Sequence, residues 1–89
     1  MTNRVTFKKQ VIEWAEKIRV TPKEIHIRPM NKKWASCSSK GRLSFNEELL
    51  QEPKSKQDEV IVHELLHLRY PNHGKMFQVM LKKLLNGWL

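Results

Sequence analysis

The sequence contains very little cysteine and no long hydrophobic run. Its 89 residues include one cysteine, Cys37, so an internal disulfide is excluded, and a structural zinc site built from several cysteines is disfavoured. No apolar stretch approaches the roughly 18 residues that a membrane-spanning helix requires. A secretory signal is not expected, because Arg4, Lys8 and Lys9 stand among polar residues near the N-terminus. We therefore expect a soluble, cytoplasmic protein with no membrane partner.

Acidic residues are also scarce, with nine Asp and Glu against 17 Lys and Arg, which gives a formal charge of +8. Such a surplus bears on partners and solubility, and not on the fold. The basic residues are scattered along the chain instead of forming one block. This favours a solvated basic surface, and binding to nucleic acid or to another acidic partner remains the alternative.

Length and patterning predict one α+β domain spanning residues 1–89. Apolar residues at helical spacing indicate a helix over residues 6–19, and period-two alternation indicates strands over 25–28, 33–38 and 42–46. The last two strands are joined by a short loop that contains Gly41, so we expect a hairpin within a small antiparallel three-stranded sheet. A short helix over 47–51 and a central buried helix over 56–69 follow, and the N-terminal helix and a C-terminal helix flank them.

Polar residues at the expected helix starts predict the helix caps. Asn46 should cap the short helix, Ser55 with Asp58 should form a capping box on the central helix, and Asn72 should cap the last helix with His73 at its first position. Asn86 and Gly87 should end that helix. Its apolar stripe is expected to comprise Phe77, Met80, Leu81, Leu84 and Trp88.

The most informative stretch is the run His-Glu-Leu-Leu-His that begins at His63 and ends at His67. On a helix, residues four apart differ by a net angle of roughly 40°, so these two imidazoles project from one face and can share one ion. Glu64 lies about 100° round from His63, beside the open side of such an ion, where a general base belongs. The spacing predicts a metal-binding helix with Glu64 as the catalytic base.

A catalytic zinc site usually takes three protein ligands and leaves a fourth position to water. His73 is the candidate for the third ligand. On an unbroken helix it would lie about 240° round from His67, but Pro71 pushes Tyr70 out of the α region and lets the chain turn back. We therefore expect one Zn²⁺ per chain, held by His63, His67 and His73.

Two simpler interpretations of these histidines stand beside the catalytic one. The first is a helix that carries two histidines by coincidence, and the second is a purely structural zinc, which is weakened by the missing fourth ligand. The surrounding helix is apolar nearly all round, so unpaired polar groups inside it would each cost about 2 kcal/mol or more, and a divalent metal supplies their partner. His26 falls on the polar side of its strand, so we expect it to face solvent.

Two further residues near the motif have alternative roles. Tyr70 lies seven residues after His63 and either donates a hydrogen bond to a developing oxyanion or packs at the end of the helix, and packing is favoured. Cys37 either approaches the zinc as an inhibitory ligand or is a small, partly buried residue of a strand, and the second role is favoured.

Two segments of the chain together resemble the YgjP-like metallopeptidase family, a zincin-like group akin to the SprT-like and WLM proteases. They are WASCSSKGRLSFN at residues 34–46 and VHELLHLRYPNH at residues 62–73, followed by Phe77. The resemblance implies a minimal zincin-like domain with His63, His67 and His73 as metal ligands and Glu64 as the base. It departs at Ala35, where the family usually has glycine.

The leading hypothesis is a zinc-dependent metallopeptidase that hydrolyses peptide or protein substrates with a zinc-activated water. An edge strand of the hairpin would hold the substrate extended, and the candidate residues for this are Trp34, Ser36 and Ser44. One alternative is a nucleic-acid-associated binding module with a structural metal. The other is a metal-dependent hydrolase of a non-peptide bond, because spacing alone does not distinguish the substrates.

Overall fold

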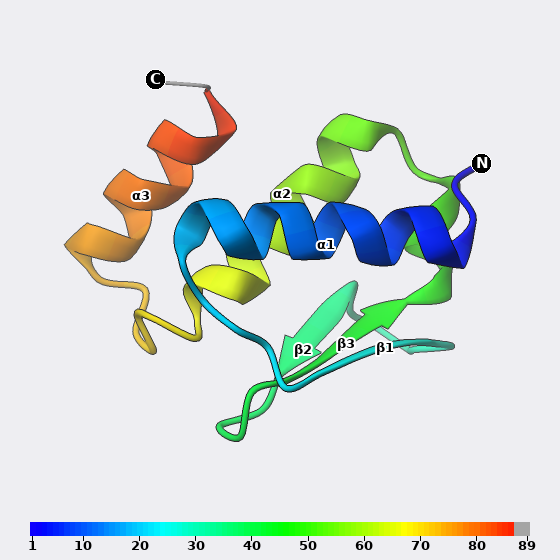
Figure 1. The fold of residues 1–89 in the computed structure, drawn as a ribbon, viewed down its shortest axis with the longest axis horizontal. Coiled ribbons are helices and arrows are strands. Elements are labelled where there is room, and N and C mark those ends of the chain that lie inside the picture. The colour runs from blue at the N-terminus through cyan, green and yellow to red at the C-terminus, as the bar shows by residue number, and fades with distance from the viewer. Residues whose placement is uncertain (87–89) are drawn as a thin grey trace.

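The structure, a computed structural model, describes residues 1–86. Its elements in chain order are α1 (Arg4–Ile18), β1 (Glu24–Arg28), β2 (Ala35–Cys37), β3 (Arg42–Asn46), the 3₁₀ helix η1 (Glu47–Gln51), α2 (Lys54–Leu66) and α3 (Lys75–Leu85). Figure 1 shows α1 and α2 on one side of the sheet and α3 set off at the end where α2 finishes. The expected α+β architecture, with a central helix between flanking helices, is confirmed. Within residues 1–86, no helix is long and apolar enough to span a bilayer.

The first helix begins two residues earlier than its apolar pattern indicated. Asn3 caps it, because its side-chain oxygen accepts a hydrogen bond of 2.8 Å from the N–H of Thr6. The buried face of α1 carries residues three or four apart, as an amphipathic helix requires. They are Phe7, Val11, Ala15 and Ile18.

The sheet differs from the expected antiparallel one. Its order is β1-β3-β2, with β2 antiparallel to β3 but β1 parallel to β3. The hairpin was therefore predicted correctly, and the direction of the third pairing was wrong. The chain reverses once between β1 and β2 and again between β2 and β3, so β3 runs in the same direction as β1. Because β3 inserts between the two earlier strands, its parallel pairing with β1 follows.

The central strand β3 provides the sheet's contribution to the core. Leu43 and Phe45 are fully buried, and the ring of Phe45 meets that of Phe7 edge-on with centroids 5.2 Å apart. At the end of β3, the side-chain oxygen of Asn46 accepts from the N–H of Glu48, which confirms its predicted capping role. Its amide nitrogen donates to two backbone carbonyls of the β1–β2 connection, those of Met30 and Lys33. Asn46 thus fixes that connection against the sheet.

The central helix α2 begins at Lys54 and ends at Leu66, instead of covering residues 56–69. Pro53 starts it, and the N–H groups of Lys56 and Gln57 donate to the Pro53 carbonyl at 3.0 Å each. The predicted capping box is absent, because the carboxylate of Asp58 binds Trp14 Nε1 at 2.9 Å and Lys54 Nζ at 2.8 Å. The apolar character of the helix is as expected. Its buried residues are Gln57, Val60, Ile61, Val62, Leu65 and Leu66.

The last helix begins at Lys75, with Gly74 as its N-cap and no side-chain cap. The prediction that Asn72 caps it and that His73 is its first residue was therefore wrong. The backbone of Gly74 is extended, so the helix starts one residue after it, and His73 lies in the connecting segment. Phe77 is its buried residue. The predicted roles of Gly87 and Trp88 lie outside the described residues.

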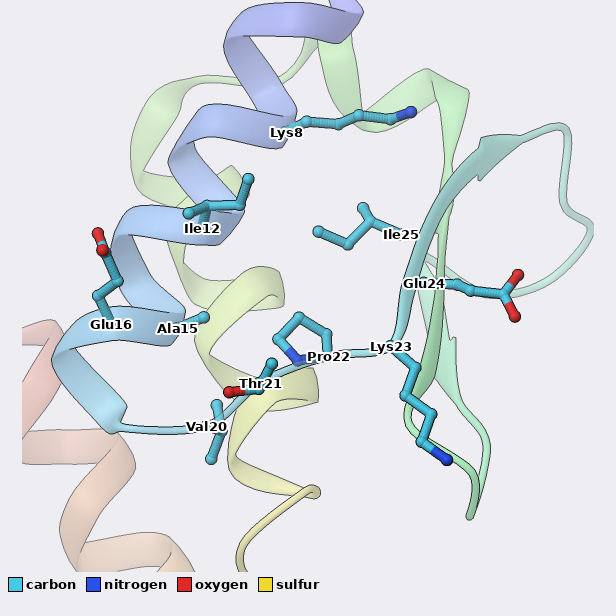
Figure 2. Close-up of a pocket in the computed structure, with 10 residues that line it drawn as sticks. All are labelled: Lys8, Ile12, Ala15, Glu16, Val20, Thr21, Pro22, Lys23, Glu24 and Ile25. Carbon is cyan, nitrogen blue, oxygen red and sulfur yellow. The ribbon is translucent and has the colours of Figure 1, made fainter.

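A pocket of about 440 Å³ lies between α1 and the outer edge of the sheet. Figure 2 shows Ile12 of α1 and Ile25 of β1 on its two sides, with Pro22 at one end. In the same view the side chains of Glu24 and Lys23 point away from it. The other edge of the sheet, formed by β2, is the one near the candidate site.

Candidate metal centre

Three histidines from two segments come together at the end of α2. His63 lies in the last turns of the helix, His67 is its C-terminal cap, and His73 lies in the segment before α3. The Nε2 atoms of His63 and His73 are 3.3 Å apart, and one ligand nitrogen from each of the three rings lies within 4.8 Å of the others. The structure therefore assembles the three histidines that the sequence analysis selected.

The return of His73 depends on how α2 ends. The N–H of His67 donates to the Glu64 carbonyl and that of Leu68 to the Leu65 carbonyl, so the last turn tightens from α to 3₁₀ pairing. The Tyr70 N–H then closes the turn on the Leu66 carbonyl at 2.7 Å. Pro71 follows and cannot continue the pairing. The chain leaves the helix there and reverses toward His63.

The ring of Phe77 contacts all three histidines. Its centroid lies 5.2 Å from that of His63, 4.9 Å from that of His67 and 4.7 Å from that of His73. Phe77 is itself 1 % exposed, so its buried ring provides the apolar surface on which the three imidazole rings pack. Phe77 was expected in the apolar stripe of the last helix and follows the matched segment at residues 62–73, but its contact with the histidines was not predicted. No local spacing rule links Phe77 to His73, because His73 lies in the segment before α3 and not on the helix.

One pair of histidine nitrogens already has the separation expected of two ligands on a tetrahedral metal ion. Nitrogen ligands about 2.0–2.1 Å from a tetrahedral ion are separated by about 3.3 Å, which is the separation of the His63 and His73 nitrogens. Burial lowers the pKa of His63, and the neighbouring His67 and His73 lower that pKa further. A neutral imidazole is the form that binds metal, so the environment of His63 favours the ligating state.

Glu64 lies beside the histidines in a partly buried position. Burial raises the pKa of its carboxyl group, while electrostatic interactions with His73 and Lys33 lower that pKa. A carboxyl group with a raised pKa accepts and returns a proton more readily near neutral pH. Lys33 was not selected from the sequence, because it belongs to the β1–β2 connection and meets Glu64 only through the fold.

A cleft of about 490 Å³ runs along β2 and reaches both Glu64 and His67. Its lining includes Ser36 and the rest of β2, and Trp34 lies just before that strand. Because β2 is an edge strand, the backbone groups on its outer side have no strand partner within the described residues. Ser44 does not share this position. It pairs with His26 on one side and Ser36 on the other, so the central strand β3 is unable to accept an added strand.

Three residues with alternative roles are placed by the structure. Cys37 lies in β2 packed against the core and outside the histidine cluster, and burial, with the charge of Glu64, raises the pKa of its thiol. Tyr70 also packs against the core. His26 is exposed on β1, where its Nε2 lies 2.8 Å from Glu24 Oε1. The structure therefore supports the strand role of Cys37, the packing role of Tyr70 and the solvent-facing position of His26.

Comparison with known protein families gives one match over nearly the whole chain. The model of the YgjP-like metallopeptidase domain matches residues 2–89. The chain belongs to the YgjP-like metallopeptidase family. It is accordingly a metal-dependent peptidase whose substrates are peptides or proteins, and the family implies a divalent metal.

Two solved structures share the fold of this YgjP-like chain. The metallopeptidase zymogen abylysin of Pyrococcus abyssi has a TM-score of 0.77 at 20% identity, over 86% of this chain and 77% of its own. The metallopeptidase zymogen jannalysin of Methanocaldococcus jannaschii has a TM-score of 0.75 at 28% identity, over 86% of this chain and 79% of its own. No sequence among the curated proteins matches the chain.

Proposed function

We propose that this YgjP-like chain is a zinc peptidase in which His63, His67 and His73 hold the metal and Glu64 is the general base. The observation that carries the proposal is the convergence of three histidine nitrogens within 4.8 Å, in a place where a cleft also reaches Glu64. A bound zinc ion would lower the pKa of water and polarise the scissile carbonyl. A nitrogen-only set of three ligands leaves one position open for this chemistry.

Glu64 moves the proton in this proposal. Its carboxylate takes the proton from the attacking water and later delivers it to the leaving amine nitrogen. The raised pKa of the carboxyl group suits it to both transfers, because the gap between its pKa and that of each partner is reduced. Lys33 helps to keep the carboxylate ionised before the reaction.

The edge strand β2 positions the substrate. An extended peptide pairs with the outer side of β2 through backbone hydrogen bonds, and Ser36 lies in the cleft beside it. Backbone pairing makes this step independent of substrate sequence. It places the scissile bond beside Glu64 and the histidine cluster.

Two measurements test the proposal. Elemental analysis of untagged protein should find about one zinc per chain, and His67→Ala should remove it. His26→Ala is the matched control, because it deletes a histidine outside the cluster and should retain the metal. Glu64→Gln should keep the zinc and lose roughly 1,000-fold or more of peptide hydrolysis. Zinc retained in His67→Ala, or normal turnover in Glu64→Gln, would contradict the assignment.

A further inference from the structure

A second pocket, of about 480 Å³, lies beside the active-site cleft and is lined by four cationic residues. They are Arg19, Lys23, Lys40 and Arg69. Within the described residues, no acidic side chain lines this pocket. We refer to it as the cationic pocket.

The cationic pocket adjoins the proposed substrate cleft at two places, the hairpin loop after β2 and the turn after α2. Ser39 lines both cavities, at the point where β2 leads into the hairpin loop. At the second place, His67 lines the cleft and Arg69, two residues further along the same turn, lines the cationic pocket. The loop from Cys37 to Lys40 spans at most about 10 Å. A peptide lying along β2 therefore reaches the cationic pocket two or three residues beyond the point where it passes Cys37.

Two hydrogen bonds join the segments that carry Lys23, Lys40 and Arg69. The N–H of Lys23 donates to the Gly41 carbonyl at 2.9 Å, which ties Lys23 to the hairpin that carries Lys40. Figure 2 shows the Lys23 side chain directed away from the Ile12–Ile25 pocket. Arg69 Nη1 donates to the Ile18 carbonyl at 3.0 Å and so brings the end of the α2 turn against the end of α1.

Arg19 occupies a backbone conformation that ordinarily favours glycine. It follows α1 with φ of 65°, in a motif where the Arg19 N–H donates to the Glu16 carbonyl and the Val20 N–H to the Ala15 carbonyl. The left-handed conformation costs a residue with a side chain about 1 kcal/mol. A glycine would close the helix more easily, but it would carry no charge into the cationic pocket.

Three of these cations are available to a ligand. Within residues 1–86, no hydrogen bond or ion pair engages the side chain of Arg19, Lys23 or Lys40. Four like charges around one concave surface favour an anionic occupant, because they repel each other until it binds. The occupant that a neighbouring peptide-binding cleft supplies is a carboxylate of the substrate.

We propose that the cationic pocket binds an acidic residue of the substrate and gives the peptidase a preference for acidic residues two or three positions from the scissile bond. This proposal rests on the proposed function, because the cleft must hold a peptide. The backbone of β2 pairs with any sequence, so the cationic pocket is the part of the site that selects among substrates.

Cleavage of a peptide library, with the products sequenced by mass spectrometry, tests the preference. Wild-type protein should enrich Asp and Glu at a fixed position two or three residues from the cleaved bond, on one side only. The double variant Lys23→Glu/Lys40→Glu balances the two remaining cations, Arg19 and Arg69, with two carboxylates and should abolish that enrichment. The control Lys9→Glu/Lys82→Glu makes the same change in net charge on exposed lysines outside both cavities and should leave the preference unchanged.

A binding measurement separates this proposal from the proposed function. Zinc-loaded Glu64→Gln protein is titrated with fluorescein-labelled peptides that differ only in an Asp pair, an Asn pair or a Lys pair. The Asp peptide should bind roughly tenfold more tightly than the Lys peptide, and Lys23→Glu/Lys40→Glu in the same background should remove that difference.

The two proposals fail in different ways. Absence of cleavage of every library peptide by wild-type protein overturns the proposed function, while selective binding of the Asp peptide would still support the cationic pocket. Cleavage without an acidic preference, or equal binding of the three peptides, overturns the cationic pocket as a specificity site. Added NaCl should weaken the preference, because exposed charges are screened over about 8 Å at physiological ionic strength.

Discussion

The ring of Phe77 lies edge-on to the ring of His73, with their centroids 4.7 Å apart and their planes at 75°. His73 precedes α3 and is exposed, whereas Phe77 is buried in the first turn of that helix. A histidine on a connecting segment would otherwise be free to adopt many conformations. The contact with Phe77 therefore orders the third candidate ligand and couples the metal centre to the packing of α3.

Replacement of Phe77 should weaken metal binding. Phe77→Leu keeps an apolar side chain but removes the ring beneath the histidines, so we expect the fold to survive and the zinc affinity to fall about tenfold. Competition with a chromogenic chelator measures this affinity. Met76→Leu is the control, because Met76 is 55% exposed on the same helix. An unchanged affinity in Phe77→Leu would remove the ring from this role.

Zinc should stabilise the folded chain. The histidines converge only in the folded state, so at a free zinc concentration 100 times the dissociation constant, binding adds about 2.7 kcal/mol to the free energy of unfolding. For a chain of this length that corresponds to a rise in Tm of about 10–20 °C over the chelator-treated protein. His26→Ala should show the same rise. His67→Ala should show little or none, and a full rise in that variant would contradict the proposed ligand set.

Glu64 should destabilise the metal-free protein at alkaline pH. Its folded-state pKa is raised above the ordinary 4.5, so the stability that its protonated form contributes is complete below pH 4.5 and is lost as the pH rises through the folded-state pKa. Glu64→Gln carries no charge and should therefore exceed the wild type in stability at pH 8 by about 1 kcal/mol. Urea unfolding of metal-free proteins measures this difference. The advantage should shrink toward pH 4.5, and a constant advantage at both pH values would refute the linkage.

Arg19→Gly should stabilise the protein while it reduces the acidic preference of the peptidase. Glycine adopts φ of 65° without the strain that a side chain adds, so we expect this variant to exceed Arg19→Ala in stability by about 1 kcal/mol. Thermal denaturation of both variants measures the strain separately from the charge, because neither carries the guanidinium group. Equal stabilities would show that the Arg19 conformation is unstrained.

The local patterns of the sequence determined most of the elements. Period-two alternation placed a strand at residues 42–46 and apolar spacing placed a helix at 56–69, and β3 has the predicted bounds while α2 lies within three residues of them. The convergence of His63, His67 and His73 was also predictable, since two of them are fixed by helical geometry and Pro71 ends the helix before the third. These features depend on residues that are close together in the chain.

The tertiary structure alone decided the features that join distant segments. Backbone hydrogen bonds are the same for any sequence, so alternation shows that β1 is a strand but not that it pairs in parallel with β3. The cationic pocket likewise combines the ends of α1 and α2 with the hairpin loop. No spacing rule links Arg19, Lys40 and Arg69, because their proximity follows from how the helices pack on the sheet.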